Sequence, residues 1–192
     1  LLTVLVTIGI IAVLSVEAFN FFKEVSVWEF LTDTQWTPLF TDKHFGILPL
    51  LSGTLLTSFI AIAFAVPVGL SISIYISEYA PRSFRKTIKP VLELLAAVPT
   101  VVYGFFALTV VTPFLQGFIP GLSGFNSLSA GLVMGIMIIP FISSLSEDAL
   151  HAVPNSLREA AYGMGSTRLQ NAFKVMVPAA SSGIIVSIIV AI

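Results

Sequence analysis

Few residues in this sequence have the type and spacing that chemistry requires. His44 and His151 each stand without a second metal ligand three or four residues away, and the chain contains no Cys. We therefore expect no metal site, no disulfide, no cofactor and no catalytic residue in this chain. The phosphate-cradling pattern of ATPases, G-x-x-x-x-G-K-[ST], is also absent, so ATP hydrolysis is not an expected activity.

Three residues of one apolar stretch are candidates for contact with a solute. Glu93 lies close to the predicted start of a membrane span, where an ionisable residue is a functional candidate. The alternative for Glu93 is an interfacial ion pair with Lys89, four residues earlier. Pro99 and Gly104 could break the helix and expose backbone N–H groups that bind an anion, or could simply kink it. We predict Glu93, Pro99 and Gly104 as candidates for a translocation path.

The polar stretch 147–178 carries the clearest signals for the start and end of helices. Ser156 and Glu159 have the spacing of a capping box, in which a Ser begins the helix and a Glu follows three residues later. Gly165 comes next, where the end of a helix needs a residue that tolerates positive φ. Thr167 opens a second capping box, with a Gln three residues later.

Each of these two short predicted helices has one apolar face, and the second is predicted to end at Pro178. The two faces consist of Leu157, Ala160, Ala161 and Met164, and of Leu169, Ala172, Phe173 and Met176. Two short helices that meet at a tight Gly turn form a compact knob, which is suited to docking against another protein. An ordinary surface loop is the alternative.

The composition places these features in a membrane protein. Hydrophobic residues make up 56% of the chain, charged residues 10%, and the mean hydropathy is +1.00. Soluble domains carry about 25% charged residues, and a soluble core of this size would leave large apolar patches exposed. We therefore predict an all-α, polytopic transmembrane helix bundle, in contact with lipid and with no nucleic-acid partner.

About five segments approach the roughly 20 apolar residues that a spanning helix needs. They are Leu1–Phe22, Ile47–Ile76, Val91–Leu115, Leu128–Leu145 and Ala179–Ile192. Because the chain begins and stops inside apolar runs, we expect it to be a piece of a longer protein. We predict two parts: 1–46, with the first span and an external loop, and 47–192, a transmembrane domain that is incomplete at its C-terminus.

Lys and Arg concentrate in two alternate loops. Of the nine basic residues, four lie in 78–90 and three in 147–178, whereas 23–46 holds two beside four acidic residues. The positive-inside rule places the first two stretches in the cytoplasm and the third outside. We interpret the basic cluster of 78–90 as a topology signal and as contacts to lipid headgroups. Its members are Arg82, Arg85, Lys86 and Lys89.

Small residues recur every four positions in the fourth predicted span, at Ser127, Gly131 and Gly135. Such a face lets two helices approach closely. We predict that it packs inside the bundle rather than forming a dedicated dimer contact.

The stretch 147–178 resembles the EAA motif of binding-protein-dependent ABC importer permeases. Its E-A-A is followed by three residues, a Gly, nine residues, and then an aliphatic residue, one further residue, an aliphatic residue and Pro, as in that family. The matching residues are Glu159, Ala160, Ala161, Gly165, Val175, Val177 and Pro178. The resemblance implies the MetI-like permease fold, and it implies that these residues form the loop that docks into the ATPase subunit.

A second resemblance concerns the solute. The runs 93–104, E-L-L-A-A-V-P-T-V-V-Y-G, and 76–81, I-S-E-Y-A-P, are similar to phosphate-specific permeases, and among them to the PstC type. This resemblance implies uptake of inorganic phosphate with an ATPase dimer, a homologous PstA-like permease subunit and a periplasmic or extracellular phosphate-binding protein, in the bacterial inner membrane. It also implies that an Arg and a Glu of the anion path lie beyond Ile192.

Other function classes remain as alternatives. Molybdate and sulfate permeases share the fold and the EAA loop, so another oxyanion is the first alternative. A secondary transporter or channel would need internal repeats and several intramembrane acids, which these spans hardly offer. An intramembrane enzyme would need a paired His, Cys or Asp constellation, which the sequence lacks.

Overall fold

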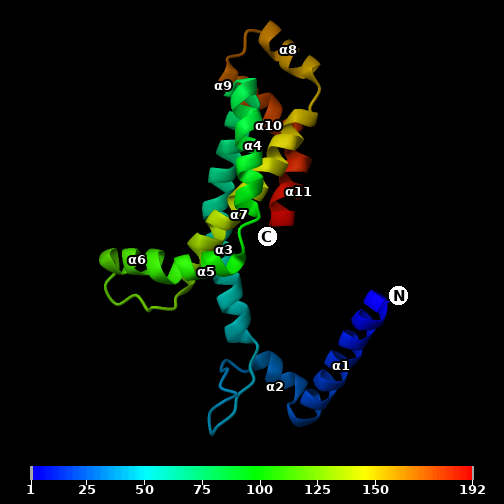
Figure 1. Ribbon diagram of the computed structural model, residues 1–192, viewed down its shortest axis with the longest axis vertical. Helices are drawn as coiled ribbons and strands as arrows, with labels where there is room; N and C mark the ends of the chain where they lie inside the picture. The colour runs from blue at the N-terminus through cyan, green and yellow to red at the C-terminus, as the bar shows by residue number, and fades with distance from the viewer. Residues whose placement is uncertain (1, 192) are drawn as a thin grey trace. The chain divides into compact units, whose positions relative to one another are not determined.

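The computed structural model describes residues 2–191, and nearly all of them are helical (Figure 1). The described part contains no strand; one isolated bridge joins Trp36 and Phe45. The chain divides into two compact units, Leu1–Leu55 and Leu56–Ile192.

Four described helices are long and apolar enough to cross a membrane, and a bent pair makes a possible fifth span. The four are Leu2–Glu24, Leu48–Tyr79, Thr100–Phe118 and Ser127–Ala152. The pair consists of Arg168–Ala179 and Ser181–Ala191, which meet at an angle of 72°. The all-α, polytopic fold predicted from the sequence is therefore confirmed.

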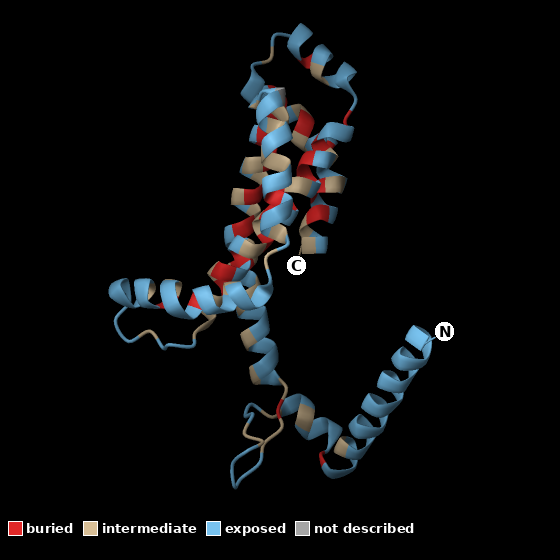
Figure 2. Ribbon diagram, in the orientation of Figure 1, coloured by how far each residue is buried: buried red, intermediate tan, exposed pale blue. Residues whose placement is uncertain are grey.

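The first unit contains α1 (Leu2–Glu24), α2 (Val27–Thr32) and the start of α3 (Leu48–Ile74). None of the residues of α1 is buried, and Figure 2 shows it exposed along almost its whole length, as expected for an apolar helix whose solvent is lipid. The loop after α2 is tied together by Asp33, whose carboxylate lies 2.8 Å from Nδ1 of His44 and accepts from the N–H of Gln35 at 3.0 Å.

The second unit is built around α7 (Ser127–Ala152), with α3, α4 (Arg82–Ala96) and α11 (Ser181–Ala191) beside it (Figure 1). One group of buried apolar side chains joins the middle of α3 to α7, and it contains Ala61, Ala65, Ile138 and Ile142. Another joins the ends of α3 and α7 to the last helices, and it contains Ile74, Leu150, Val153, Ala172, Met176, Ala180 and Ile184. α7 and α11 also share a buried hydrogen bond of 2.6 Å between the hydroxyls of Ser146 and Ser187.

Close packing of α7 against α3 depends on two glycines. A Cβ at Gly131 would lie 2.7 Å from Cβ of Ile60, and one at Gly135 would lie 2.9 Å from Cδ1 of Phe64. Both separations are shorter than any carbon contact that packed side chains tolerate. The predicted small-residue face therefore packs inside the bundle, because only residues without a side chain let the two backbones approach this closely.

Three π-helical turns interrupt the second unit: η1 (Tyr75–Tyr79) at the end of α3, η2 (Ala107–Val111) and η3 (Ala172–Met176). η2 lies between α5 (Thr100–Phe106) and α6 (Thr112–Phe118), so that the three form one continuous helix. η3 lies between α9 (Arg168–Asn171) and the short α10 (Val177–Ala179).

The predicted third span, Val91–Leu115, is wrong at its start. The helix that contains Val91, α4, ends at Ala96. Pro99 adopts an extended conformation with ψ of 134°, and the apolar helix begins at Thr100. A residue before proline is sterically driven away from helical geometry, which explains the break at Val98. Val91–Ala96 belong instead to α4, a separate helix with charged residues on one face that packs along α7.

Candidate functional site

The first helix of the predicted knob, α8 (Asn155–Gly163), begins two residues earlier than its predicted capping box allows. Pro154 occupies the N-cap position, and Ser156 lies inside the helix without a capping hydrogen bond. The predicted capping box of Ser156 and Glu159 is therefore wrong. Proline suits the start of a helix because its φ is fixed near the helical value and its missing N–H would have no partner there. Glu159 is exposed in mid-helix.

Gly165 ends α8 as predicted. Its φ is +83°, its N–H donates to the carbonyl of Tyr162 at 2.9 Å, and the next N–H, of Ser166, donates to the carbonyl of Ala161 at 3.1 Å. These two bonds are the pair that defines a Schellman motif. The hydroxyl of Ser166 also donates to the carbonyl of Ala161, at 2.8 Å. The Ala and the Gly of the E-A-A pattern are thus joined by one turn, and Ala161 is the buried residue of α8.

The second predicted capping box is confirmed at the start of α9. The side chain of Gln170 accepts from the N–H of Thr167 at 3.0 Å, and the hydroxyl of Thr167 accepts from the N–H of Gln170 at 3.3 Å. Beyond α9 the helix continues through Pro178, so the predicted end at that residue is wrong; the 72° bend falls at Ala180. Pro178 has no N–H to offer to the carbonyl four residues before it, and the preceding turn is the π-helical η3.

The apolar residues of the knob (residues 155–171, α8 to α9) mostly face solvent. Leu157 is 43% exposed, Met164 83% and Leu169 60% (Figure 2). On the predicted second face, Ala172 and Met176 are buried but Phe173 is exposed. Exposed apolar side chains at the tip of a loop mark a surface that is available to another protein. Val175 and Val177 are half-buried below it, and Val177 packs on the apolar core.

The base of the knob is held by a buried ion pair that sequence reasoning missed. Nη2 of Arg158 donates to Oε1 of Glu78 at 3.0 Å, and the two side chains are only 16% and 4% exposed. The same guanidinium donates to the carbonyl of Leu150 in the last turn of α7 at 3.0 Å, and to Oδ1 of Asn155 at 2.9 Å.

A second buried carboxylate joins α4 to α7. Oε1 of Glu147 lies 3.3 Å from Nε of Arg85, an electrostatic contact without the alignment of a hydrogen bond, and Oε2 lies 3.3 Å from Nζ of Lys89. Lys89 also contacts Asp148, and Nη2 of Arg85 donates to the carbonyls of Ile76 and Ser77 at the end of α3. The alternative pairing of Glu93 with Lys89 is therefore wrong. Arg85 and Lys89 are engaged inside the bundle rather than left for lipid headgroups.

The two ion pairs cross between the two basic stretches. The acid that opens 78–90, Glu78, pairs with a base of 147–178, and the acid that opens 147–178, Glu147, pairs with bases of 78–90. The stretches thus share one end of the second unit, as expected of two loops on the same side of a membrane. A glutamate at the head of each basic stretch was the available signal in the sequence, but the choice of partner depends on the fold.

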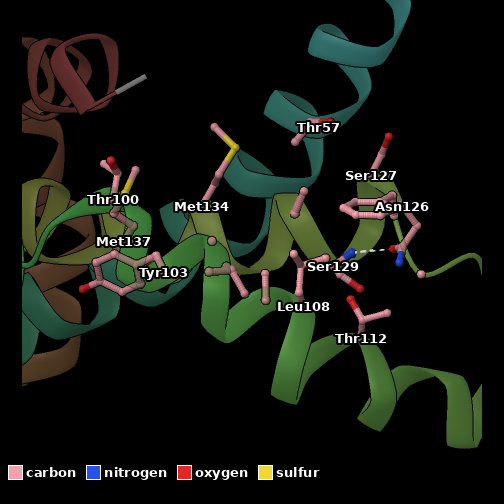
Figure 3. A pocket seen from close by; sticks show the side chains of 16 residues that line it. Thr57, Thr100, Tyr103, Leu108, Thr112, Asn126, Ser127, Ser129, Met134 and Met137 are labelled. Carbon is pink, nitrogen blue, oxygen red and sulfur yellow. Dashed lines mark hydrogen bonds between the residues drawn. The ribbon is translucent and has the colours of Figure 1, made fainter.

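A cavity of about 690 Å³ lies toward the other end of α7, and its walls come from α3, the continuous helix of α5, η2 and α6, and the loop 124–126 with the following part of α7 (Figure 3). Of the predicted path residues, Gly104 lines it and Pro99 caps the helix that forms one wall, whereas Glu93 is exposed on α4 and does not line it. The hydroxyls of Thr112 and Ser129 point into the same region, are almost wholly buried, and have no hydrogen-bond partner in the described part of the chain (Figure 3). None of the residues that line this cavity is charged.

Comparison with known proteins adds an independent observation. The family model described as "Binding-protein-dependent transport system inner membrane component" matches residues 65–192. A probable ABC transporter permease protein, YqgH of Bacillus subtilis, is 42% identical over 156 residues, which is 81% of this chain and 50% of the relative. The phosphate transport system permease protein PstC of Mesorhizobium japonicum is 38% identical over 184 residues, covering 86% of this chain and 56% of the relative.

A solved structure shares the fold. A chain of the MetNI methionine ABC transporter, in an inward-facing conformation, superposes with a TM-score of 0.56 at 23% identity, over 76% of this chain and 66% of that chain. The chain spans about half the length of the curated relatives that it matches.

Proposed function

This chain belongs to the family of binding-protein-dependent transport system inner membrane components, and from that premise we propose that it is part of the permease subunit of an ATP-driven importer of inorganic phosphate. The observation that supports phosphate is the similarity to proteins named PstC, which extends over most of the chain. Members of this family are transport subunits, so ATP hydrolysis belongs to a separate subunit.

The knob supports the coupling part of this proposal. Its apolar side chains are exposed, its turn is fixed by the Schellman motif at Gly165, and its base is attached to two membrane helices by Arg158. We propose that Glu159, Ala160 and Gly165 meet an ATPase subunit here, that the buried Ala161 supports them from the inner side of α8, and that Val175, Val177 and Pro178 set the direction of the following helix. The proposed complex contains an ATPase dimer, a PstA-like permease subunit and an external phosphate-binding protein. Alternating access would then follow rigid-body movement of helices around the solute.

The uncharged cavity supports a place for part of the solute path. An anion that has lost its water needs N–H or O–H donors, and the unpaired hydroxyls of Thr112 and Ser129 could supply two. We propose Gly104 and Pro99 as path residues beside this cavity. Glu93, which is exposed on α4 and does not line this cavity, stays a proposal as a residue of the translocation path.

An uptake experiment tests the solute. The full-length gene is expressed with its partner subunits in cells that lack their own phosphate importer, and uptake of labelled phosphate, molybdate and sulfate is measured. We expect phosphate alone to be accumulated in an ATP-dependent way. Uptake of molybdate or sulfate without phosphate would overturn the solute and leave the family assignment intact.

Cysteine labelling tests the orientation, because the chain has no native Cys. Lys86, exposed on α4, and Leu39, exposed in the loop 33–47, are replaced singly by Cys. A reagent that cannot cross the membrane is expected to label Leu39→Cys in intact cells and Lys86→Cys only after the cells are opened. The opposite pattern would reverse the proposed topology.

A further inference from the structure

Arg158 attaches the knob to the membrane helices at two residues, Glu78 and Leu150, and a third contact holds it to the knob itself. Its guanidinium donates to Glu78 in η1 through Nε at 3.2 Å and Nη2 at 3.0 Å, to the carbonyl of Leu150 in α7, and to Asn155 in α8 itself. A planar guanidinium whose N–H groups donate to several acceptors is fixed in one orientation. The ammonium group of a lysine is a single point of contact, so its side chain could rotate about that point.

Apolar packing does little to fix α8. Ala161 is the one buried residue between Asn155 and Gly163, and Leu157 is largely exposed. The ion pair, by contrast, is withdrawn from water, with Glu78 at 4% exposure. Buried ion pairs add little net stability, but breaking one leaves an uncompensated buried charge, so they hold a geometry firmly.

The helix ends to which Arg158 is bonded also contact one another. Glu78 belongs to the π-helical end of α3, where the carbonyls of Ile76 and Ser77 accept from Arg85 of α4. Arg85 in turn contacts Glu147 of α7. A displacement of α8 at Arg158 therefore reaches the ends of α3, α4 and α7 through contacts that cannot lengthen without exposing an unpaired charge.

We propose that Arg158 and Glu78 are positioning residues that convert movement of the knob into movement of the membrane helices. This inference rests on the proposed function, ATP-driven import, and names the contact through which its force passes. Neither residue needs to touch the ATPase or the solute. Their loss should uncouple the two, leaving ATP hydrolysis without proportionate transport.

The main experiment compares Arg158→Gln and Glu78→Gln with a matched control, Lys86→Gln, in the full-length complex reconstituted in lipid vesicles. Lys86 is an exposed base on α4, at the same end of the unit. We expect ATPase subunits to co-purify with all three variants. Phosphate uptake per ATP hydrolysed should fall on the order of tenfold in the first two, because each leaves a buried charge unpaired, and should be unchanged in the control.

Two further variants keep the result interpretable if a single substitution impairs folding. Arg158→Lys keeps the charge and should recover only part of the coupling, whereas the exchange of Glu78→Arg with Arg158→Glu should recover more than either change alone. If uptake and hydrolysis fall together with the amount of bound ATPase in every variant, the pair serves docking or folding and the proposal is overturned. Unchanged uptake per ATP would also overturn it.

A cross-link separates failure of this proposal from failure of the proposed solute. Ala80 and Tyr162 line one hollow beside the ion pair and are replaced together by Cys. We expect a bifunctional thiol reagent to cross-link the pair in similar yield with and without ATP when Arg158 is present, and in lower, ATP-dependent yield with Arg158→Gln. This outcome in a complex that carries no phosphate would refute the solute and support the attachment. Equal yields with and without Arg158 would refute the attachment whatever the solute.

Discussion

Two buried carboxylates at one end of the second unit and two buried hydroxyls toward its other end differ in how they are paired. At one end, the carboxylates of Glu78 and Glu147 are each met by bases from another element. Toward the other end, Thr112 and Ser129 line the cavity, and their buried hydroxyls have no hydrogen-bond partner among the described residues. Ser129 and Glu147 lie on the same helix, about 27 Å apart at 1.5 Å per residue.

The difference indicates different tasks. A buried polar group without a hydrogen-bond partner lowers the stability of the fold, so we expect to find one where it has a function other than stability. The paired end fixes relative positions of four helical elements, which suits the transmission of force. The two hydroxyls instead keep their hydrogen-bonding capacity for a molecule that enters the cavity, which suits contact with a solute or with water.

The largest expected effect is at the paired end. Glu147→Ala removes the acid that Arg85 and Lys89 share; Lys89 keeps Asp148, but the charge of Arg85, 22% exposed, loses its carboxylate partner. We expect a loss of about 3–5 kcal/mol of folding stability, seen as little protein in the membrane fraction and a lower unfolding temperature. Asp148→Ala is the control, since Asp148 is 55% exposed and exposed pairs contribute at most about 1 kcal/mol. Equal effects would show that burial of the pair is unimportant.

A smaller effect is expected at the turn of the knob. Gly165→Val forces a β-branched residue into a φ of +83°, at a cost of about 1–2 kcal/mol. The permease should insert in normal amounts, but with fewer ATPase subunits bound and less uptake, because the knob changes its tilt. Gly163→Ala is the matched control: this helical glycine has open space around its Cβ position and does not adopt positive φ. Normal ATPase binding by Gly165→Val would remove the knob from the docking surface.

Substitutions in the cavity should affect uptake without lowering stability, whereas Glu147→Ala lowers stability. Thr112→Val and Ser129→Ala remove hydroxyls that have no hydrogen-bond partner in the described part of the chain. The free energy of unfolding should therefore stay the same or rise by no more than about 1 kcal/mol, and the unfolding temperature should follow it. Uptake should nevertheless fall several-fold if the hydroxyls meet the solute. Thr109→Val is a suitable control, since the Thr109 hydroxyl already donates to the carbonyl of Phe105 at 2.8 Å. A large loss of stability would mean that these hydroxyls are satisfied after all.

The smallest effect lies outside both ends, in the loop of the first unit. The hydrogen bond to Asp33 raises the pKa of His44, and the same bond lowers the pKa of Asp33. The contribution of His44 is complete below its unfolded pKa of about 6.5 and is lost as pH rises through its raised folded value. That of Asp33 is present above about pH 3.9 and is lost as pH falls through its lowered folded value.

We therefore expect the loop to be tightest in mildly acidic solution. Trp36 stacks edge-on against Phe45, next to His44, so its fluorescence should report loosening at both ends of a titration. His44→Gln should abolish the alkaline change and leave the rest of the chain unaffected. An alkaline change that persists in this variant would assign it to another group.

The sequence was sufficient where local signals decide the structure. Apolar length predicted the spans, Gly165 predicted the end of α8, and Thr167 predicted the start of α9, because each depends on neighbouring residues alone. It failed where two local signals compete. Pro154 starts α8 in place of Ser156, and the extended Pro99 separates α4 from the helix that follows.

Tertiary choices could not be foreseen. Lys89 has Glu93 one turn away, but it pairs with Glu147 and Asp148 of another helix. An exposed pair one turn apart on a helix gains only about 0.3–0.5 kcal/mol. Lys89 therefore pairs with the buried carboxylate of Glu147, which would otherwise lack a partner, rather than with Glu93. The cavity was also beyond reach, since it is lined by residues from three separate stretches of the chain.

The π-helical turns have a consequence for how relatives are aligned. Each holds one residue more than an α-helical turn, so every side chain beyond it is rotated by about 100°. At η3 this rotation puts Asn171, Ala172 and Met176 inside, while Leu169 and Phe173, which share a face by α-helical spacing, lie outside. Where a homologous sequence lacks the extra residue, the correct alignment has a gap of one position within 75–79, 107–111 or 172–176. Alignments normally penalise gaps inside helices, so this gap would be missed. Family resemblance across such a gap would otherwise pair a lipid-facing residue with a buried one.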